Sequence, residues 1–246
     1  METGPTTPVA LVCSVPLEAE PVRRALRAAS TARVGGKEAV EGVLGTTRVV
    51  LLAAGMGKVN AAHGLTALLE ARPVRAVVGF GVGGAYPGAG LDVGAVALAT
   101  REIYGDEGAD TPAGWISTES IGIALAEREG ERLFNEFPVD PKLLSRARRA
   151  LQRAGMPAVA GPFVTVSCCS GTLARGESLA HRFSAVCESM EGAAYAHVAA
   201  IYGVPFMELR GISNLVENRD LARWRLKEAA EAAARAVQFS ILNFEF

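Results

Sequence analysis

Polar residues that could contact a ligand follow an apolar run near the C-terminus. The segment RGISNLVENRD, Arg210 to Asp220, comes directly after the run VPFMEL and before an alanine-rich helical pattern. Ligand sites of open α/β sheets lie at such strand ends, so we expect this junction to face a site. Asn214 at its centre carries an amide that can both donate and accept hydrogen bonds. The residues alone leave open the alternative that Asn214 or Asn218 caps the next helix.

A glutamate opens a second segment of interest, AVCESMEGAAYAHVAA. Glu191 begins a predicted helix there, and the other residues of that helix are nearly all small or apolar. A carboxylate in such surroundings caps its helix, is paired, or holds a ligand. As a ligand group, Glu191 could accept hydrogen bonds from two neighbouring sugar hydroxyls while Met190 packs against the sugar.

Two more acids follow the first apolar run, VALVCSV. Glu18 and Glu20 lie in the first turn of the helical pattern PLEAEPVRRAL, where they suit the helix dipole. A carboxylate at the active end of a sheet could instead activate water as a general base. Position alone gives these two interpretations equal weight.

Glycines dominate the end of a third apolar run. The segment VVGFGVGGA, Val77 to Ala85, has four glycines within six residues, so a ligand could lie against the bare backbone of Gly81, Val82 and Gly83. No regular helix follows at once, which argues against a dinucleotide site. The segment AAGMGKVNAA lacks the glycine spacing and the Lys-Ser/Thr pair of a phosphate loop.

Apolar runs that could form strands alternate with helical patterns along the chain. This alternation predicts an α/β fold with a largely parallel sheet covered by helices. Residues 104 to 142 lack clean periodicity, and we expect a substrate loop there with a short helix in SIGIALAEREG, residues 120–130. The expected strands fall within residues 9–15, 48–55, 74–83, 94–105, 158–167 and 204–213, and the first two expected helices within 17–29 and 58–71.

Composition limits the class of protein. The 246 residues include 50% hydrophobic residues, enough for one domain over residues 1–246, with residues 1–8 expected to be flexible. Because 25 basic residues face 26 acidic ones, we expect a small-molecule partner and neither nucleic acid nor a membrane. We find no signal peptide or membrane-length apolar run, which favours the cytoplasm. The four cysteines lack the spacing of a zinc site or a disulfide framework and are expected to be reduced, mostly buried thiols.

Taken in order, these segments resemble the nucleoside phosphorylase and nucleosidase superfamily, and particularly its hydrolases, which include methylthioadenosine/S-adenosylhomocysteine nucleosidase. The resemblance runs over nearly the whole chain, through PLEAE, GMGKVNAA, GFGVGGA, LDVGAVAL, SMEGAAYAHVAAIYGVPF and RGIS. It implies a three-layer α/β/α sandwich with a central mixed, largely parallel sheet. It further implies a homo-oligomer, a dimer or built from dimers, that cleaves an N-glycosidic bond without a cofactor or metal.

The resemblance also assigns roles to single residues. Met190 and Glu191 match the ribose-binding Met-Glu pair of the family. Glu18 matches the glutamate that activates water, with Glu20 as the alternative. Thr165 and Val166 fall near the strand end that stacks on the base, although the usual Ser-Gly-Asp-Ala-Phe pattern is absent there.

The phosphorylases of the superfamily carry a phosphate-binding arginine in the loop after the first strand. None occurs between Val9 and Pro21, which favours hydrolysis.

Asn214 stands where the adenine-specific hydrolases have an aspartate. Hypoxanthine presents two acceptors at this edge, a carbonyl and a ring nitrogen, which an amide NH2 can serve and an ionised carboxylate cannot. The sequence therefore predicts a 6-oxopurine, and such a polar match discriminates strongly between bases.

The continuation ISNLVENRDLARW and the stretch IYGDEGADTPAGW are similar to the futalosine hydrolase branch of the superfamily. That branch releases hypoxanthine from futalosine in the chorismate-derived route to menaquinone. Its substrate has a carboxylated aromatic group on the 5′ side of the sugar. Arg219 or Arg210 could bind that carboxylate, and Trp115, Phe134 and Phe137 could line the pocket or equally belong to the core.

The expected mechanism combines three residues. Glu191 holds the ribose, Glu18 takes a proton from the attacking water, and Asn214 stabilises the negative charge on the departing base. Another 6-oxopurine nucleosidase, a phosphorylase with an unusual phosphate site, and a nucleoside-binding protein without catalysis remain as alternatives.

Overall fold

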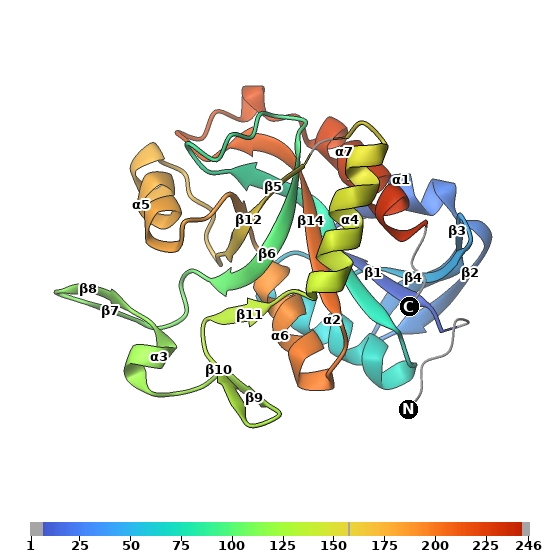
Figure 1. Cartoon of the computed structure of the whole chain (residues 1–246), viewed down its shortest axis with the longest axis horizontal. Coiled ribbons are helices and arrows are strands. Elements are labelled where there is room, and N and C mark those ends of the chain that lie inside the picture. The colour runs from blue at the N-terminus through green and yellow to red at the C-terminus, as the bar shows by residue number, and fades with distance from the viewer. Residues whose placement is uncertain (1–6, 157, 243–246) are drawn as a thin grey trace.

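A mixed β-sheet forms the centre of the protein (Figure 1), which we describe from a computed structural model for residues 7–156 and 158–242. The expected flexibility of residues 1–8 falls largely outside these described residues. The sheet strands are, in spatial order, β11 (Glu136–Pro138), β6 (Val96–Tyr104), β12 (Ala158–Thr165), β13 (Cys187–Ser189), β5 (Ala76–Ala85), β1 (Val9–Cys13), β4 (Thr47–Ala53), β3 (Lys37–Leu44) and β2 (Arg27–Val34), and β14 (Phe206–Leu215) pairs with both β5 and β6.

Parallel pairing joins the strands that bring the site together. Strand β1 pairs in parallel with β4 and β5, and β5 pairs in parallel with β14. These four strands are rich in Val, Ile, Leu and Gly and are buried on both faces, as parallel strands under helices must be. Antiparallel pairing occurs at the margins, in β2–β3–β4 and β11–β6, and where β13 meets β5 and β6 meets β14.

Helices cover both faces of the sheet, which confirms the predicted three-layer arrangement (Figure 1). One apolar core lies between the sheet and α1 (Pro16–Ala25), α4 (Pro141–Arg153) and α7 (Leu226–Ile241). The other lies between the sheet and α2 (Lys58–Ala71) and α6 (Gly192–Tyr202), while α5 (Leu173–Phe183) packs near β12. Small alanines on α6 and α7 let these helices lie close to the strands.

The region without periodicity forms two hairpins and one short helix that extend away from the sheet (Figure 1). The hairpins are β7 (Ala109–Thr111) with β8 (Gly114–Ile116), and β9 (Ala126–Arg128) with β10 (Glu131–Leu133). The helix is α3 (Thr118–Ile121), so the prediction of a helix within residues 120–130 is wrong for most of that range. Glu129 and Gly130 both have positive φ, which makes a two-residue hairpin turn and excludes a helix there.

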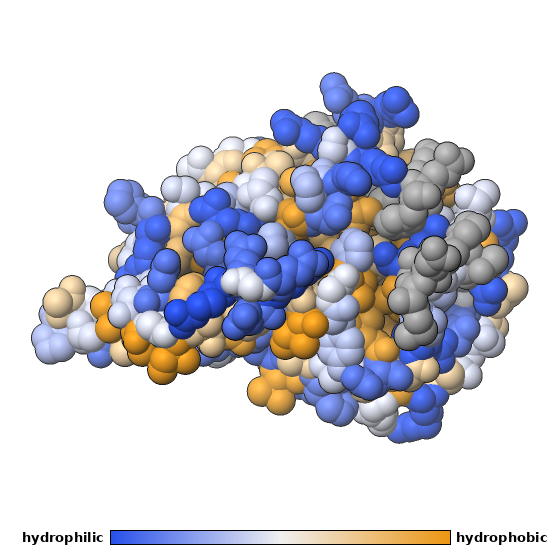
Figure 2. All heavy atoms as spheres, turned by 60° about the horizontal axis from the view of Figure 1, so that its bottom comes forward, coloured by the Kyte–Doolittle hydropathy of each residue, from blue (hydrophilic) through white to orange (hydrophobic). Residues whose placement is uncertain are grey.

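The surface on the lower side of Figure 1 is mixed, with apolar side chains gathered in separate patches among polar ones (Figure 2). Met56 and Val59, next to and within α2, are 61% and 84% exposed. In the described part of the chain, no helix has both the length and the apolar character needed to cross a membrane.

Candidate active site

A cavity of about 240 Å³ lies where β1, β5 and β14 end and α6 begins. Of the residues predicted to form the site, it brings together those at these strand and helix ends. They are Glu18, Val82, Gly83, Met190, Glu191, Asn214 and Arg219. Segments from the N-terminal, middle and C-terminal parts of the chain thus meet at one point, at the sheet end expected from the sequence.

Glu18 is buried in the first turn of α1, and its carboxylate also faces the cavity. Oε2 accepts hydrogen bonds from the backbone N–H groups of Ser14 and Val15, at 2.8 and 3.1 Å, and from the Ser14 hydroxyl at 2.7 Å. Oε1 accepts from the Val82 N–H at 2.8 Å. Glu18 therefore both caps α1 and faces the cavity, and one lone-pair position of its Oε1 is left for water. Glu20, the alternative base, is exposed and does not line the cavity.

Glu191 stands at the N-cap of α6 but makes no side-chain capping hydrogen bond. Its Oε1 accepts instead from the Gly57 N–H at 2.9 Å, and its Oε2 lies 3.4 Å from both terminal nitrogens of Arg210. Burial raises the pKa of this carboxyl, and the Arg210 guanidinium partly offsets that rise. The capping interpretation of Glu191 therefore does not account for its position.

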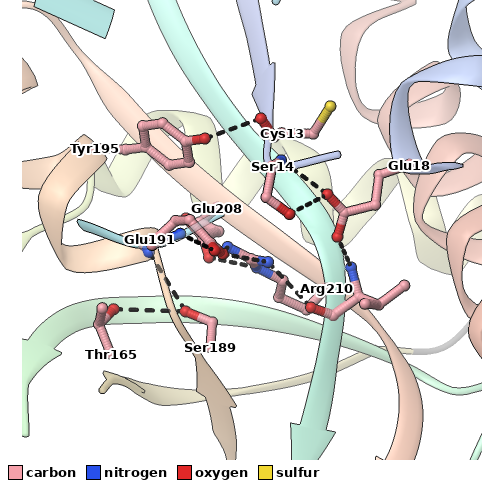
Figure 3. A network of polar contacts seen from close by, with 12 residues as sticks. Cys13, Ser14, Glu18, Thr165, Ser189, Glu191, Tyr195, Glu208 and Arg210 are labelled. Atoms are coloured by element: carbon pink, nitrogen blue, oxygen red, sulfur yellow. Dashed lines mark hydrogen bonds and ion pairs between the residues drawn. The ribbon is translucent and has the colours of Figure 1, made fainter. Parts of the chain in front are cut away.

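Arg210 is the buried cation of the site, and β14 carries it (Figure 3). It donates from Nε to Glu208 Oε1 at 2.7 Å and from one terminal nitrogen to the Val82 carbonyl at 3.0 Å. Burial alone disfavours its charged form, but the carboxylates of Glu208 and Glu191 raise the pKa of Arg210. Because Glu18 and Arg210 hold the two sides of Val82, the backbone at the end of β5 is fixed on both sides.

Two further carboxyl groups, those of Glu102 and Glu208, lie close together beside Arg210. Glu102 and Glu208 are fully buried, and a side chain at Gly192 would clash with both of their carboxyl groups. Neither Glu102 oxygen has a hydrogen-bond partner among the described residues. Burial and the nearby Glu208 raise the pKa of Glu102 well above its ordinary value. Glu102 therefore holds its proton more tightly than an exposed glutamate does.

Asn214 is half-buried near the end of β14 and lines the cavity. Its Oδ1 accepts from the Ser213 hydroxyl at 2.8 Å, and its Nδ2 donates to the Leu215 carbonyl at 3.0 Å. It caps no helix. Asn218 accepts from the Leu173 N–H of α5, and Asp220 is the cap of the 3-10 turn η1 (Leu221–Arg223). One N–H of the Asn214 amide remains available to a ligand.

Three predicted site residues do not line the cavity. Gly81 lies just behind it, where a side chain would collide with Glu18 and approach Arg210. Thr165 is buried, and its hydroxyl accepts from the Ala193 N–H at 2.8 Å, which fixes the first turn of α6. Val166 belongs to an apolar cluster under α5. Gly81 thus leaves room for Glu18, and Thr165 fixes the helix turn that follows Glu191. Val166 does not reach the cavity.

Arg219 and Trp224 form the outer wall of the cavity. The Arg219 guanidinium lies over the Trp224 ring, 4.7 Å from its centroid, and has no ion pair within the described residues. The aromatic residues first considered for this wall lie elsewhere. Phe137 is buried and stacks on His197, while Trp115 and Phe134 line a different hollow beside β10.

Glu188 and Trp224 are among the cavity residues to which the sequence alone assigned no role. Glu188, on β13, is buried and lines the cavity with its loop neighbour Ser170. Trp224 was noticed only as part of a resembling segment. Nothing local marks Glu188, because its surroundings depend on the pairing of β13 with β5.

The cysteines hold no disulfide among the described residues. Cys13 and Cys187 are buried, and burial raises the pKa of both thiols, so they stay protonated. Cys168 is exposed, and Cys169 is half-buried at the cavity wall with a raised pKa, again mainly from burial.

The fold and the carboxylate-lined cavity agree with the family that comparison with known proteins identifies. The family model described as "Phosphorylase superfamily" matches residues 8–241, and the chain belongs to that superfamily. Among its curated relatives is the futalosine hydrolase of Thermus thermophilus, which is 41% identical over 192 residues, 78% of this chain and 80% of the relative. The futalosine hydrolase of Streptomyces coelicolor is 36% identical over 194 residues, 76% of each chain.

A solved structure shares the fold. The 5′-methylthioadenosine/S-adenosylhomocysteine nucleosidase of Neisseria meningitidis, in complex with methylthio-immucillin-A, has a TM-score of 0.84 at 24% identity, covering 97% of this chain and 100% of that chain. The predicted family and fold are thus confirmed, and so is the predicted enzyme class, an N-glycosidic hydrolase.

Proposed function

We propose that the enzyme hydrolyses the N-glycosidic bond of futalosine, releasing hypoxanthine and dehypoxanthine futalosine in the futalosine pathway of menaquinone biosynthesis. The observation that carries this proposal is the meeting of Glu18, Glu191 and Asn214 around one cavity. Each supplies one of the three interactions that cleavage of a nucleoside needs. The identity to two futalosine hydrolases supports the choice of substrate.

Glu191 binds the ribose hydroxyls in this mechanism. Its carboxylate is held by Gly57 and Arg210 and still has acceptor positions facing the cavity. Positive charge develops on the sugar as the bond to the base breaks, and an ionised carboxylate nearby stabilises it more in the transition state than in the ground state. Met190, beside it in the lining, packs against the sugar.

Glu18 takes the proton from the attacking water. Its free Oε1 position lies beside the Val82 backbone, and its other oxygen is fully occupied by three donors. The carboxylate therefore cannot rotate without losing several hydrogen bonds, so it presents one basic oxygen to the cavity. The water oxygen then bonds to the sugar carbon as the base departs with the bonding electrons.

Asn214 stabilises the negative charge that builds on the departing base. Its unused N–H donates to an acceptor on the 6-oxopurine, the ring nitrogen or the carbonyl. An amide is too weak an acid to protonate the base, so the leaving group is stabilised by hydrogen bonding and by solvent.

Hydrolysis is favoured over phosphorolysis by the charges around the cavity. Arg210 is a buried cation there, but Glu208 and Glu191 already surround it. Glu18 and Glu188 line the same space. A phosphate dianion would enter among carboxylates, which repel it, whereas water is neutral.

Arg219 binds the carboxylate on the 5′ side of futalosine. It lines the cavity without an ion pair in the described chain, and Trp224 beneath it offers an aromatic surface for the substrate's ring.

We further propose that the enzyme is a cytoplasmic homo-oligomer. The exposed Met56 at the cavity and Val59 on α2 suit an apolar contact with a second copy.

The test is a product assay on the purified protein. We expect hypoxanthine from futalosine at a rate that phosphate does not change, and much slower release from inosine, which lacks the 5′ group. Equal turnover of inosine would make the enzyme a general 6-oxopurine nucleosidase, and dependence on phosphate would make it a phosphorylase. Binding without turnover would leave a nucleoside-binding protein and refute the proposal.

A further inference from the structure

Glu188 is a buried carboxylate at the cavity that the proposed mechanism does not use. It is 5% exposed and lines the same space as Glu18, Glu191 and Asn214. A carboxylate buried at a ligand site is costly unless its acceptor positions are filled. Its hydrogen bonds therefore show which position a ligand can fill.

Three donors reach the Glu188 carboxylate. Oε2 accepts from the Ser170 hydroxyl at 2.6 Å and from the Tyr86 hydroxyl at 3.0 Å, while Oε1 accepts from the Ser170 N–H at 2.8 Å. A carboxylate has about four acceptor positions, two on each oxygen. Within the described chain, one position on Oε1 is left, and a ligand that fills it must be a donor.

The strand register places Glu188 opposite Asn214. Both residues pair with Gly84 of β5, Glu188 from β13 on one edge and Asn214 from β14 on the other. Neighbouring strands lie about 4.8 Å apart, so the two Cα atoms are separated by roughly 10 Å. Gly84 between them has no side chain, and a Cβ there would come within 3.2 Å of Asn214 Nδ2 and 2.8 Å of Val216.

Glu188 and Asn214, on the two sides of Gly84, have opposite hydrogen-bonding character. Glu188 offers one acceptor, and Asn214 offers one unused N–H donor. A 6-oxopurine has a donor at ring nitrogen one and acceptors at the 6-carbonyl and ring nitrogen seven. A 6-aminopurine has an acceptor at ring nitrogen one and a donor at the 6-amine, so it would set a lone pair against the Glu188 carboxylate.

We propose that Glu188 accepts the N–H of ring nitrogen one of the 6-oxopurine, so that Glu188 and Asn214 read the base from its two ends. This inference rests on the proposed function and makes Glu188 a specificity-determining residue of the same site. The carboxylate also holds the Ser170 loop against the base, because its remaining oxygen positions bind that loop and Tyr86. Rejection of 6-aminopurines then comes from an unpaired, repelled group.

The test compares two substrates in Glu188→Gln. The substrates are futalosine and its 6-amino counterpart, in which adenine replaces hypoxanthine. A charged hydrogen bond is lost with futalosine, so we expect its kcat/KM to fall about 10- to 100-fold. The 6-amino substrate should keep its kcat/KM or gain, because the negative charge that faces the lone pair of its ring nitrogen one is removed. The preference for the 6-oxo substrate is the readout that a merely structural role would not move.

Tyr86→Phe is the matched control, since it removes one hydrogen bond to Glu188 and leaves the carboxylate in place. We expect it to affect both substrates equally. Binding of free hypoxanthine and adenine to Glu188→Gln, measured by calorimetry, gives the same comparison if turnover is too slow to measure. An equal loss for both substrates in Glu188→Gln would overturn the inference. The proposed function fails separately, if the unaltered enzyme releases no hypoxanthine from futalosine.

Discussion

Replacing Glu191 by Gln should remove the strongest interaction with the sugar. The change keeps the size of the side chain but takes away the negative charge and half of the acceptor positions. In the unaltered enzyme, one carboxylate oxygen of Glu191 accepts from the Gly57 N–H at 2.9 Å, and the other faces Arg210 at 3.4 Å. Because both neighbours are donors, the new NH2 group must face one of them without a partner.

The magnitude follows from these contacts. A hydrogen bond to a charged group contributes about 1.5 to 3 kcal/mol, and a buried donor left without a partner costs about 1 to 3 kcal/mol. Part of the second cost falls on the free enzyme as well, so we expect a loss of about 2 to 4 kcal/mol in transition-state binding. That corresponds to a fall in kcat/KM of about 30- to 900-fold.

The assay is hypoxanthine release from futalosine by chromatography, with thermal unfolding to show that the variant folds. Glu102→Gln is the matched control, because Glu102 is also buried, has a raised pKa that favours its protonated form, and does not line the cavity. We expect the control to stay within about threefold of the unaltered enzyme, since Glu102 touches no part of the cavity and burial favours its uncharged form. A Glu191→Gln enzyme within the same range would refute the assignment of Glu191 to the ribose.

Three further outcomes test other parts of the site. Asn214→Asp should lower kcat/KM for futalosine at least about tenfold, because an ionised carboxylate cannot donate to the base, and unchanged turnover would contradict the base contact. Arg219→Met should raise the KM for futalosine about three- to tenfold and leave that for inosine unchanged. Arg223→Met is its control, because Arg223 is paired with Glu217 outside the cavity, and an equal effect of both variants would argue against a specific contact. The kcat/KM should fall on acidification at a higher pH than an ordinary glutamate would give, because the raised pKa of Glu191 lets it gain a proton earlier; a profile flat down to the ordinary glutamate pKa would exclude this.

Local sequence signals predict several of the residues that line the candidate cavity. Glu191 is recognisable because a carboxylate stands among small apolar residues, and Glu18 because it follows a buried strand at the active end of the sheet. Asn214 is recognisable because it lies near the end of the last strand before a helix. Strand and helix order along the chain likewise predicts the layers, since hydrophobic patterning and connection rules leave few arrangements.

Other parts depend on contacts between distant segments. Glu188 reaches the cavity through the register of β13 against β5, and Glu102 and Glu208 both lie where only Gly192 leaves room for them. The prediction of a helix at Glu129 is wrong because the segment ALAEREGERL contains good helix formers. The turn at Glu129 and Gly130, both with positive φ, determines the local structure instead.

The buried pair of Glu102 and Glu208 also bears on how acid affects the folded protein. Burial raises the pKa of both carboxyls, with Arg210 opposing the rise. A group whose pKa is raised on folding binds its proton more tightly in the folded state. Its contribution to stability is therefore complete below the unfolded-state pKa and is lost as pH rises through the folded-state pKa. These two carboxyls work against acid unfolding, whereas acids whose pKa is lowered on folding promote it, so the core around Gly192 should lose stability as the pH rises rather than as it falls.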